Sequence, residues 1–144
     1  MIPVNVVNTV DPSAFPTPAA FGNWVRIQLI LMVGVNCGLI RRHKVSPLYQ
    51  SGVRFREEPR GVETFVDALT CERKGHGDCA HLAAWRCAEY RSIGVPAEIR
   101  IRWRHPVYHV VVRLPHGRFP RAKRDRYGVW IEDPSAELGM PSSD

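Results

Sequence analysis

This chain lacks a Cys-x-x-Cys motif, and it lacks the pattern of a secretory signal peptide. The four cysteines, Cys37, Cys71, Cys79 and Cys87, contain no Cys-x-x-Cys motif, which argues against a redox motif or a common structural zinc site. No basic segment followed by an apolar core begins the sequence, so we expect no secretory signal peptide. We therefore expect free thiols in a reducing compartment.

A long apolar run is missing as well. The most apolar stretch, residues 21–40, is interrupted by Arg26, Gln28 and Asn36, and its longest unbroken run is Leu29 to Val35. A transmembrane helix needs about 20 predominantly apolar residues. The sequence therefore predicts a buried helix in this stretch and no contact with a membrane.

The length and composition are those of one globular domain. The chain has 144 residues, of which 44% are hydrophobic and 24% charged. Four prolines fall within residues 1–20, which predicts an extended arm there, followed by a single domain over residues 21–144. No internal repeat or low-complexity segment is evident.

The hydrophobic patterns predict an α+β fold. Three segments have helical patterns: 22–43, 61–70 and 79–91. Asp78 is the expected N-cap of the third helix, and Gly94 is its expected stop. Three later segments have the character of strands: 97–103, 108–114 and 128–133. Short connections between these strands predict an antiparallel meander.

Three residues in the second half of the chain have the chemistry of a thiol enzyme. Cys79 begins a predicted helix, where unpaired N–H groups lower a thiol pKa and its own N–H can bind an oxyanion. His109 lies in a predicted strand and can act as the base, and Asp133 ends the next strand and can orient the imidazole. Each also has an inert interpretation, as a buried cysteine, a structural histidine and an aspartate in a turn before proline.

The segments around these residues resemble a known family. The stretches GHGDCAHLAAWRCAEYRSIGVPAEIRIRW, YHVVVRL and GVWIEDPS, within residues 75–135, are similar to the core of the transglutaminase-like cysteine peptidases. The resemblance implies a papain-like core, in which the cysteine-bearing helix packs on a small antiparallel sheet. It also implies that Cys79 is the nucleophile, His109 the base and Asp133 the orienting acid.

A narrower resemblance extends over residues 20–140. SPLYQSGVRFREEP and EDPSAELGM look like segments of small transglutaminase-like proteins of tailed bacteriophages. It implies a phage-encoded protein of the host cytoplasm or the virion, with other phage structural proteins as partners. Ala80 and His81 depart from that pattern, because acidic residues commonly follow the cysteine in those proteins.

Several further residues are weaker candidates. Asp78, His76 and His81 flank the cysteine and are possible supporting groups, although the spacing places His81 off the helix face of Cys79. Tyr49 and Gln50 are guesses for a second oxyanion donor. The spacing of Cys71, His76, Cys79 and Cys87 fits no common structural zinc pattern, so we expect neither a metal nor another cofactor.

Arginine dominates the positive charge. The net charge is +6, and only three of the 20 basic residues are lysines. One basic segment, between the last two predicted strands, is either a solvated loop or a surface that contacts DNA or an acidic partner. Its basic residues are Arg118, Arg121, Lys123, Arg124 and Arg126.

Two main functions follow as expectations. The first is a thiol hydrolase that cleaves an amide or isopeptide bond of a protein or peptide, with hydrolysis preferred over transfer to an amine because no amine subsite is evident. The second is a structural or adaptor component of a phage head, neck or tail that uses the same fold without required activity. A nucleic-acid-binding module ranks last, because no helix concentrates the arginines.

Overall fold

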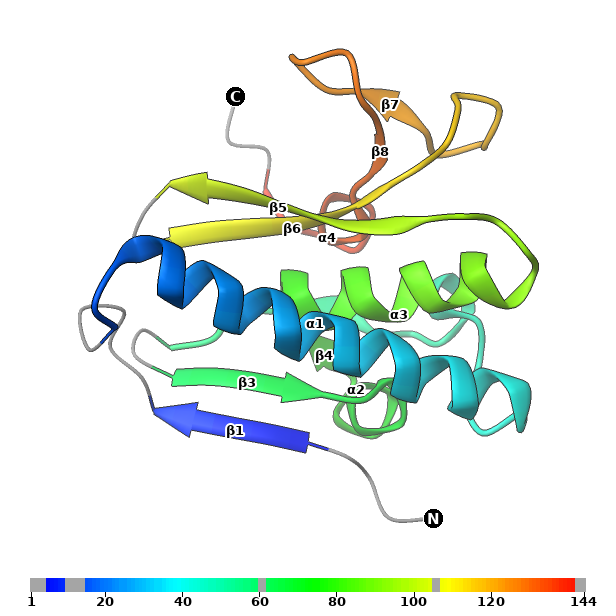
Figure 1. Ribbon diagram of the computed structural model, residues 1–144. Coiled ribbons are helices and arrows are strands. Elements are labelled where there is room, and N and C mark those ends of the chain that lie inside the picture. Colours follow the sequence, from blue (N-terminus) through cyan, green and yellow to red (C-terminus); the bar gives the residue numbers. More distant parts are fainter. Residues whose placement is uncertain (1–4, 10–14, 60–61, 105–106, 142–144) are drawn as a thin grey trace.

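The computed structural model describes residues 5–9, 15–59, 62–104 and 107–141. Figure 1 shows two helices, α1 (Pro18–Arg41) and α3 (Cys79–Ser92), between a four-stranded sheet and a two-stranded sheet. The two helices pack against each other, and α3 also packs on the central strand of the larger sheet. This arrangement confirms the α+β class and the packing of the Cys79 helix on a small antiparallel sheet.

The larger sheet has the strand order β5 (Glu98–Arg104), β6 (Val107–Arg113), β8 (Trp130–Glu132), β7 (Lys123–Arg124). All of its neighbouring strands are antiparallel, so the predicted three-strand meander is confirmed. The short strand β7 was not predicted, because it lies in the basic segment that the sequence indicated to be a loop. The β6–β8 ladder pairs Val112 with Glu132 and Arg113 with Ile131.

The first helix begins earlier than the pattern predicts. Thr17 caps it by accepting a hydrogen bond from the Ala20 N–H at 3.1 Å, and Pro18 occupies the first turn, where its missing N–H costs nothing. The last residues of the predicted arm therefore belong to α1. Residues 5–9 form β1 (Asn5–Thr9), which pairs with β3 (Val62–Val66), while residues 1–4 and 10–14 lie outside the described residues.

The helix predicted over residues 61–70 is wrong. Val62, Thr64 and Val66 are β-branched and suit a strand, and β1 supplies the antiparallel partner that the local pattern could not reveal. Helix α2 (Ala68–Lys74) starts only after Asp67, whose side chain accepts a hydrogen bond from the Thr70 N–H at 2.8 Å. Asp67 is thus the N-cap of α2.

Short elements complete the fold between these layers. A 3-10 turn covers Leu48–Gln50, β2 (Arg54–Phe55) pairs in parallel with β4 (His76–Gly77), and α4 (Pro134–Glu137) follows β8. Strand β4 leads directly into α3, so the β2–β4 pairing fixes the chain just before Cys79. Gly94, with φ of 85°, follows the last turn of α3, as predicted.

The core lies where α1, α3 and β6 meet. Its fully buried members are apolar side chains from all three elements, including Phe21, Leu29, Met32, Ala84, Val110 and Val112. A second cluster around Trp85, Leu48 and Leu82 lies on the other side of α3. Helix α3 contributes Ala80 and Ala83 to the first cluster and Leu82 to the second, so its N-terminus is held in place by both clusters.

Helix α1 has two different faces. It is the one helix in the described part of the chain that is long and apolar enough, by length and composition, to span a bilayer. One face lies in the core, from Phe21 to Leu39. Ile27, Ile30 and Leu31 are exposed on the other face.

Candidate active site

The Cys79 thiol lies at the first turn of α3, as predicted. Asp78 is the N-cap, and its carboxylate accepts a hydrogen bond from the His81 N–H at 3.1 Å. Glycine suits position 77, just before the cap, because a Cβ there would lie in tight contact, 3.2 Å from both the Cys71 Sγ and the His81 Cβ. The sequence Gly-Asp-Cys therefore combines a close backbone approach with a helix cap.

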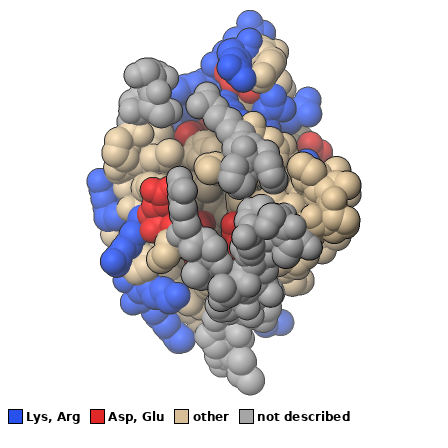
Figure 2. All heavy atoms as spheres, turned by 90° about the vertical axis from the view of Figure 1, so that its left-hand side faces the viewer, with Lys and Arg blue, Asp and Glu red and all other residues tan. Residues whose placement is uncertain are grey.

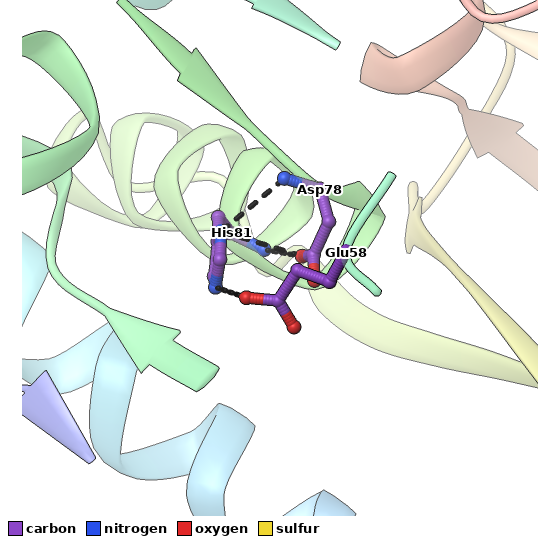
Figure 3. Close-up of side chains that lie close together, drawn as sticks. All are labelled: Glu58, Asp78 and His81. Atoms are coloured by element: carbon purple, nitrogen blue, oxygen red, sulfur yellow. Dashed lines mark hydrogen bonds and ion pairs between the residues drawn. The ribbon is translucent and has the colours of Figure 1, made fainter. Parts of the chain in front are cut away.

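His81 completes this cap from the other side, and Figure 3 shows the arrangement. The His81 Nδ1 accepts a hydrogen bond from the Asp78 N–H at 3.2 Å, and its Nε2 hydrogen-bonds the Thr64 carbonyl on β3. The sequence placed His81 off the helix face of Cys79, and the structure shows what this orientation achieves. His81 supports the site by tying the start of α3 to β3.

We expect the His81→Ala substitution to lower the free energy of unfolding by about 1–3 kcal/mol, because it leaves the buried Asp78 N–H and Thr64 carbonyl without their partner. Urea unfolding followed by circular dichroism measures this loss. The matched control is His76→Ala, which removes a half-buried imidazole from the neighbouring strand β4 and should change stability by less than about 1 kcal/mol. Equal losses in both variants would contradict this role.

The imidazole and the acid expected beyond the cysteine are together in the structure. His109 Nε2 lies 2.9 Å from the Asp133 Oδ2, although 24 residues separate them. Asp133 also caps α4, because its Oδ1 accepts from the N–H groups of Ser135 at 3.1 Å and Ala136 at 3.4 Å. Three hydrogen bonds thus fix the carboxylate that orients the His109 ring.

The pKa of Asp133 reflects these contacts. Burial alone would raise it, but the hydrogen bond and charge of His109, together with the Ser135 and Ala136 N–H groups, lower the pKa of Asp133 below its usual value. The carboxylate therefore stays ionised beside the imidazole at neutral pH. An ionised acid is what the role of an orienting group requires.

Cys79 lies against the same strand that carries His109. The Val110 N–H, one residue beyond His109 on β6, approaches the Cys79 sulfur, as does the Ala80 N–H. Helix α3 packs on β6, and within the described ranges β8 pairs with β6 only at Val112 and Arg113. Among the described residues, no hydrogen bond joins the Cys79 Sγ to the His109 ring. Because the Nε2 of His109 is bonded to Asp133, Nδ1 is the ring nitrogen that is left to accept a proton from the thiol.

The environment of Cys79 favours the neutral thiol. Burial raises the pKa of Cys79 most, the negative charges of Asp78 and Asp133 raise it further, and the Val110 and Ala80 N–H groups oppose them. The sequence predicted a lowered pKa, from the helix N-terminus and from pairing of the thiolate with the imidazole. The prediction missed the burial of the thiol and the carboxylates around it.

Asp78 also lies beside a second carboxyl group, Glu58, and the sequence did not predict this pair. Glu58, in the loop before β3, accepts from the Thr64 N–H at 3.2 Å and lies 3.7 Å from the His81 Nε2. Burial and the charge of Asp78 raise the pKa of Glu58 to about 7, and burial raises the pKa of Asp78 to about 6. Glu63 on β3 adds a third carboxyl, which accepts from the Tyr108 hydroxyl at 2.7 Å.

These groups border a recess in the molecular surface. A cavity of about 290 Å³ is lined by Glu58, Asp78 and His81, and by the basic groups of Arg56, Lys74 and His76. Figure 2 shows the face to the left of Figure 1, where Asp and Glu gather near the centre while Lys and Arg lie around the edge. The predicted supporting residue His76 therefore belongs to this cavity with Asp78 and His81.

The same cluster has the donor atoms of a metal site. One atom each from Glu58, Asp78 and His81 lies within 4.8 Å of the others. Both ring nitrogens of His81 are, however, occupied by the Asp78 N–H and the Thr64 carbonyl. Binding a metal through His81 would break the cap of α3, so the residues do not fit a resident ion.

Tyr49 does not face the cysteine, contrary to its suggested role as an oxyanion donor. Its hydroxyl donates to the Glu132 Oε2 at 2.5 Å, and Gln50 is exposed. Glu132 is fully buried and also accepts from the Arg86 Nε at 2.6 Å and from the Tyr90 hydroxyl. Sequence reasoning missed this network, since its members lie 42 to 83 residues from Glu132 along the chain.

The basic segment lies away from the cysteine and is mostly exposed. Arg121 lies over the Tyr49 ring and 3.6 Å from Glu137, and Arg124 lies over the Trp130 ring. Lys123 and Arg124 form β7, while Arg118 and Arg126 are exposed. Much of this charge therefore remains available to an acidic partner.

Comparison with protein-family models, with curated proteins and with solved structures found no match.

Proposed function

We propose that the protein is a thiol hydrolase of the papain-like, transglutaminase-like type, which acts through Cys79, His109 and Asp133 on an amide or isopeptide bond of a protein or peptide. The observation that carries this proposal is the 2.9 Å hydrogen bond between His109 Nε2 and Asp133, on the strand that passes Cys79. The order of these elements along the chain supports the proposal further: a helix that begins with the cysteine comes first, a strand with the histidine second, and a strand that leads to the aspartate third.

In the proposed reaction each of these groups has one role. The Cys79 thiol gives its proton to the His109 Nδ1 as sulfur attacks the carbonyl carbon, which forms a C–S bond and an oxyanion. The Cys79 N–H lies in the first turn of α3, where N–H groups lack an intrahelical acceptor, and it stabilises that oxyanion. The C–N bond then breaks, and the amine leaves with the proton from His109.

Water completes the cycle. His109 takes a proton from the attacking water, the C–S bond of the thioester breaks, and the thiol recovers its proton as the carboxylic acid leaves. Asp133 holds the ring in the orientation that both steps need and stabilises its charged form. Because the raised pKa keeps the resting thiol neutral, proton transfer to His109 accompanies the attack instead of preceding it.

A direct test is to trap the acyl-enzyme. We expect para-nitrophenyl acetate, an activated acyl donor, to release nitrophenol in a burst and to leave an acetyl group on Cys79, which peptide mass spectrometry locates. The matched control is Cys37→Ala. Cys37 is also a partly buried thiol, but its Sγ contacts the Ala88 carbonyl instead of an imidazole. It should retain the burst. Acetylation spread evenly over the four cysteines, with no burst, would contradict the proposal.

A further inference from the structure

The carboxyl pair of Glu58 and Asp78 lines the cavity next to the nucleophile. Asp78 immediately precedes Cys79, and one oxygen from each of the two carboxyl groups lies within 4.8 Å of the other. Two carboxylates at this distance do not both ionise easily, so one proton is shared between them. The Thr64 N–H and the His81 ring hold the Glu58 side chain in this position.

The charges around the carboxyl pair come from every neighbouring element. The groups that line the cavity with it are Arg56 and Glu57 after β2, Lys74 at the end of α2, the His76 imidazole of β4, whose pKa is lowered, and the His81 imidazole of α3. Its other neighbours are Glu63 of β3, Cys71 of α2, Tyr108 of β6 and Cys79 of α3. His81 is neutral, because its Nδ1 accepts from the Asp78 N–H. The net local charge on the Cys79 side is therefore set mainly by carboxyl groups.

We propose that the carboxyl pair is a proton-controlled regulator of Cys79: with one shared proton the thiol can react, and loss of that proton adds a second negative charge that suppresses the thiolate. Glu58 is in this sense a positioning residue, which acts on the nucleophile through Asp78. The inference rests on the proposed function, since it concerns the same cysteine.

Geometry and charge support this inference together. Asp78 has one oxygen committed to the His81 N–H, so its charge is held beside the first turn of α3. The negative charge of Asp78 already raises the pKa of Cys79. The raised pKa values of Glu58 and Asp78 place the loss of the shared proton near neutral pH, within the range where a cell or a compartment can change it.

The test compares E58Q with E57Q. Both remove one carboxylate, but Glu57 is exposed whereas Glu58 contacts the cap, and the amide of E58Q can still hydrogen-bond Asp78. The readout is the rate of iodoacetamide alkylation at Cys79 between pH 5 and 9, located by mass spectrometry. We expect E58Q to react about tenfold faster than wild type at pH 8, equivalent to one pKa unit, and to differ little at pH 5.5. E57Q should follow the wild type.

The outcomes separate this inference from the proposed function. An equal rise in E58Q and E57Q, or a profile of E58Q that matches the wild type, would overturn the regulator. E58A also removes the charge and serves as a second variant if E58Q folds poorly. It should show the same rise in alkylation rate at pH 8. A wild-type profile for E58A would count against the inference. His109→Ala tests the base independently. If Cys79 is alkylated at the same rate in this variant as in the wild type, the proposed function is contradicted, whereas the regulator is not.

Discussion

Replacing Cys79 by alanine should lower turnover of an acyl donor by three orders of magnitude or more, on the order of what removal of a catalytic nucleophile costs elsewhere. The physical reason is that no other described thiol lies beside the His109–Asp133 pair, since Cys71 and Cys87 are buried in the core clusters and Cys37 contacts the Ala88 carbonyl. Stability should change by less than about 1 kcal/mol, because only one sulfur is removed. Burst kinetics and thermal unfolding measure the two effects.

Cys79→Ser is the matched control for this result. Serine keeps the shape of the side chain but replaces the thiol with a smaller and far less acidic hydroxyl, so the variant should fold and lose most of the turnover. The alternative function, a structural component of a particle, predicts a different outcome. In that case Cys79→Ala leaves function intact, while neutralising Arg118, Arg121, Lys123, Arg124 and Arg126 abolishes it.

Replacing Glu132 by alanine should destabilise the fold by about 3–5 kcal/mol. Glu132 is fully buried, and its loss leaves the Arg86 guanidinium and the hydroxyls of Tyr49 and Tyr90 without their shared acceptor. These contacts join α3, the turn at Leu48–Gln50 and β8, so the start of α4 and Asp133 should loosen as well. Urea unfolding gives the free energy.

A second pair of variants isolates the ion pair. Arg86→Met leaves a buried carboxylate without its cation. The double variant R86M/E132Q removes both charges, and its amide oxygen still accepts from the tyrosine hydroxyls. The double variant should therefore be more stable than Arg86→Met. Glu137→Ala is the control, because this exposed carboxylate only pairs with Arg121 at 3.6 Å and should cost less than about 1 kcal/mol. If R86M/E132Q is as unstable as the sum of its single variants, the ion pair is not the source of the stability.

The second half of the chain could be predicted from its sequence because local signals there agree with the packing. Asp78 and Gly94 mark the two ends of α3, and the alternating pattern from Ala97 to Trp103 marks a strand whose partner follows after a short turn. The antiparallel pairing of these late strands then brings His109 toward Asp133, as predicted. Connections that are short in sequence leave few alternatives.

The first half could not be predicted in the same way, because its partners are far apart in sequence. Residues 62–66 form a strand only because residues 5–9 pair with them, and their local spacing suggested a helix. Glu58 reaches the start of α3 across 20 residues, and Glu132 meets Tyr49 across 83. Such contacts leave no periodic signal along the chain, so local patterns could not reveal them.

The central claim is that His109 activates Cys79, and the pH dependence of Cys79 alkylation tests it most directly. In the wild type, the rate of reaction with iodoacetamide should depend on His109, so that His109→Ala lowers the rate at neutral pH at least tenfold while leaving the slow alkylation of Cys37 unchanged. Asp133→Asn should give a comparable loss, since it keeps the cap of α4 but places an amide N–H against the His109 Nε2, which forces the tautomer whose Nδ1 cannot accept the thiol proton. A Cys79 that reacts at the same rate with and without His109 would contradict the account.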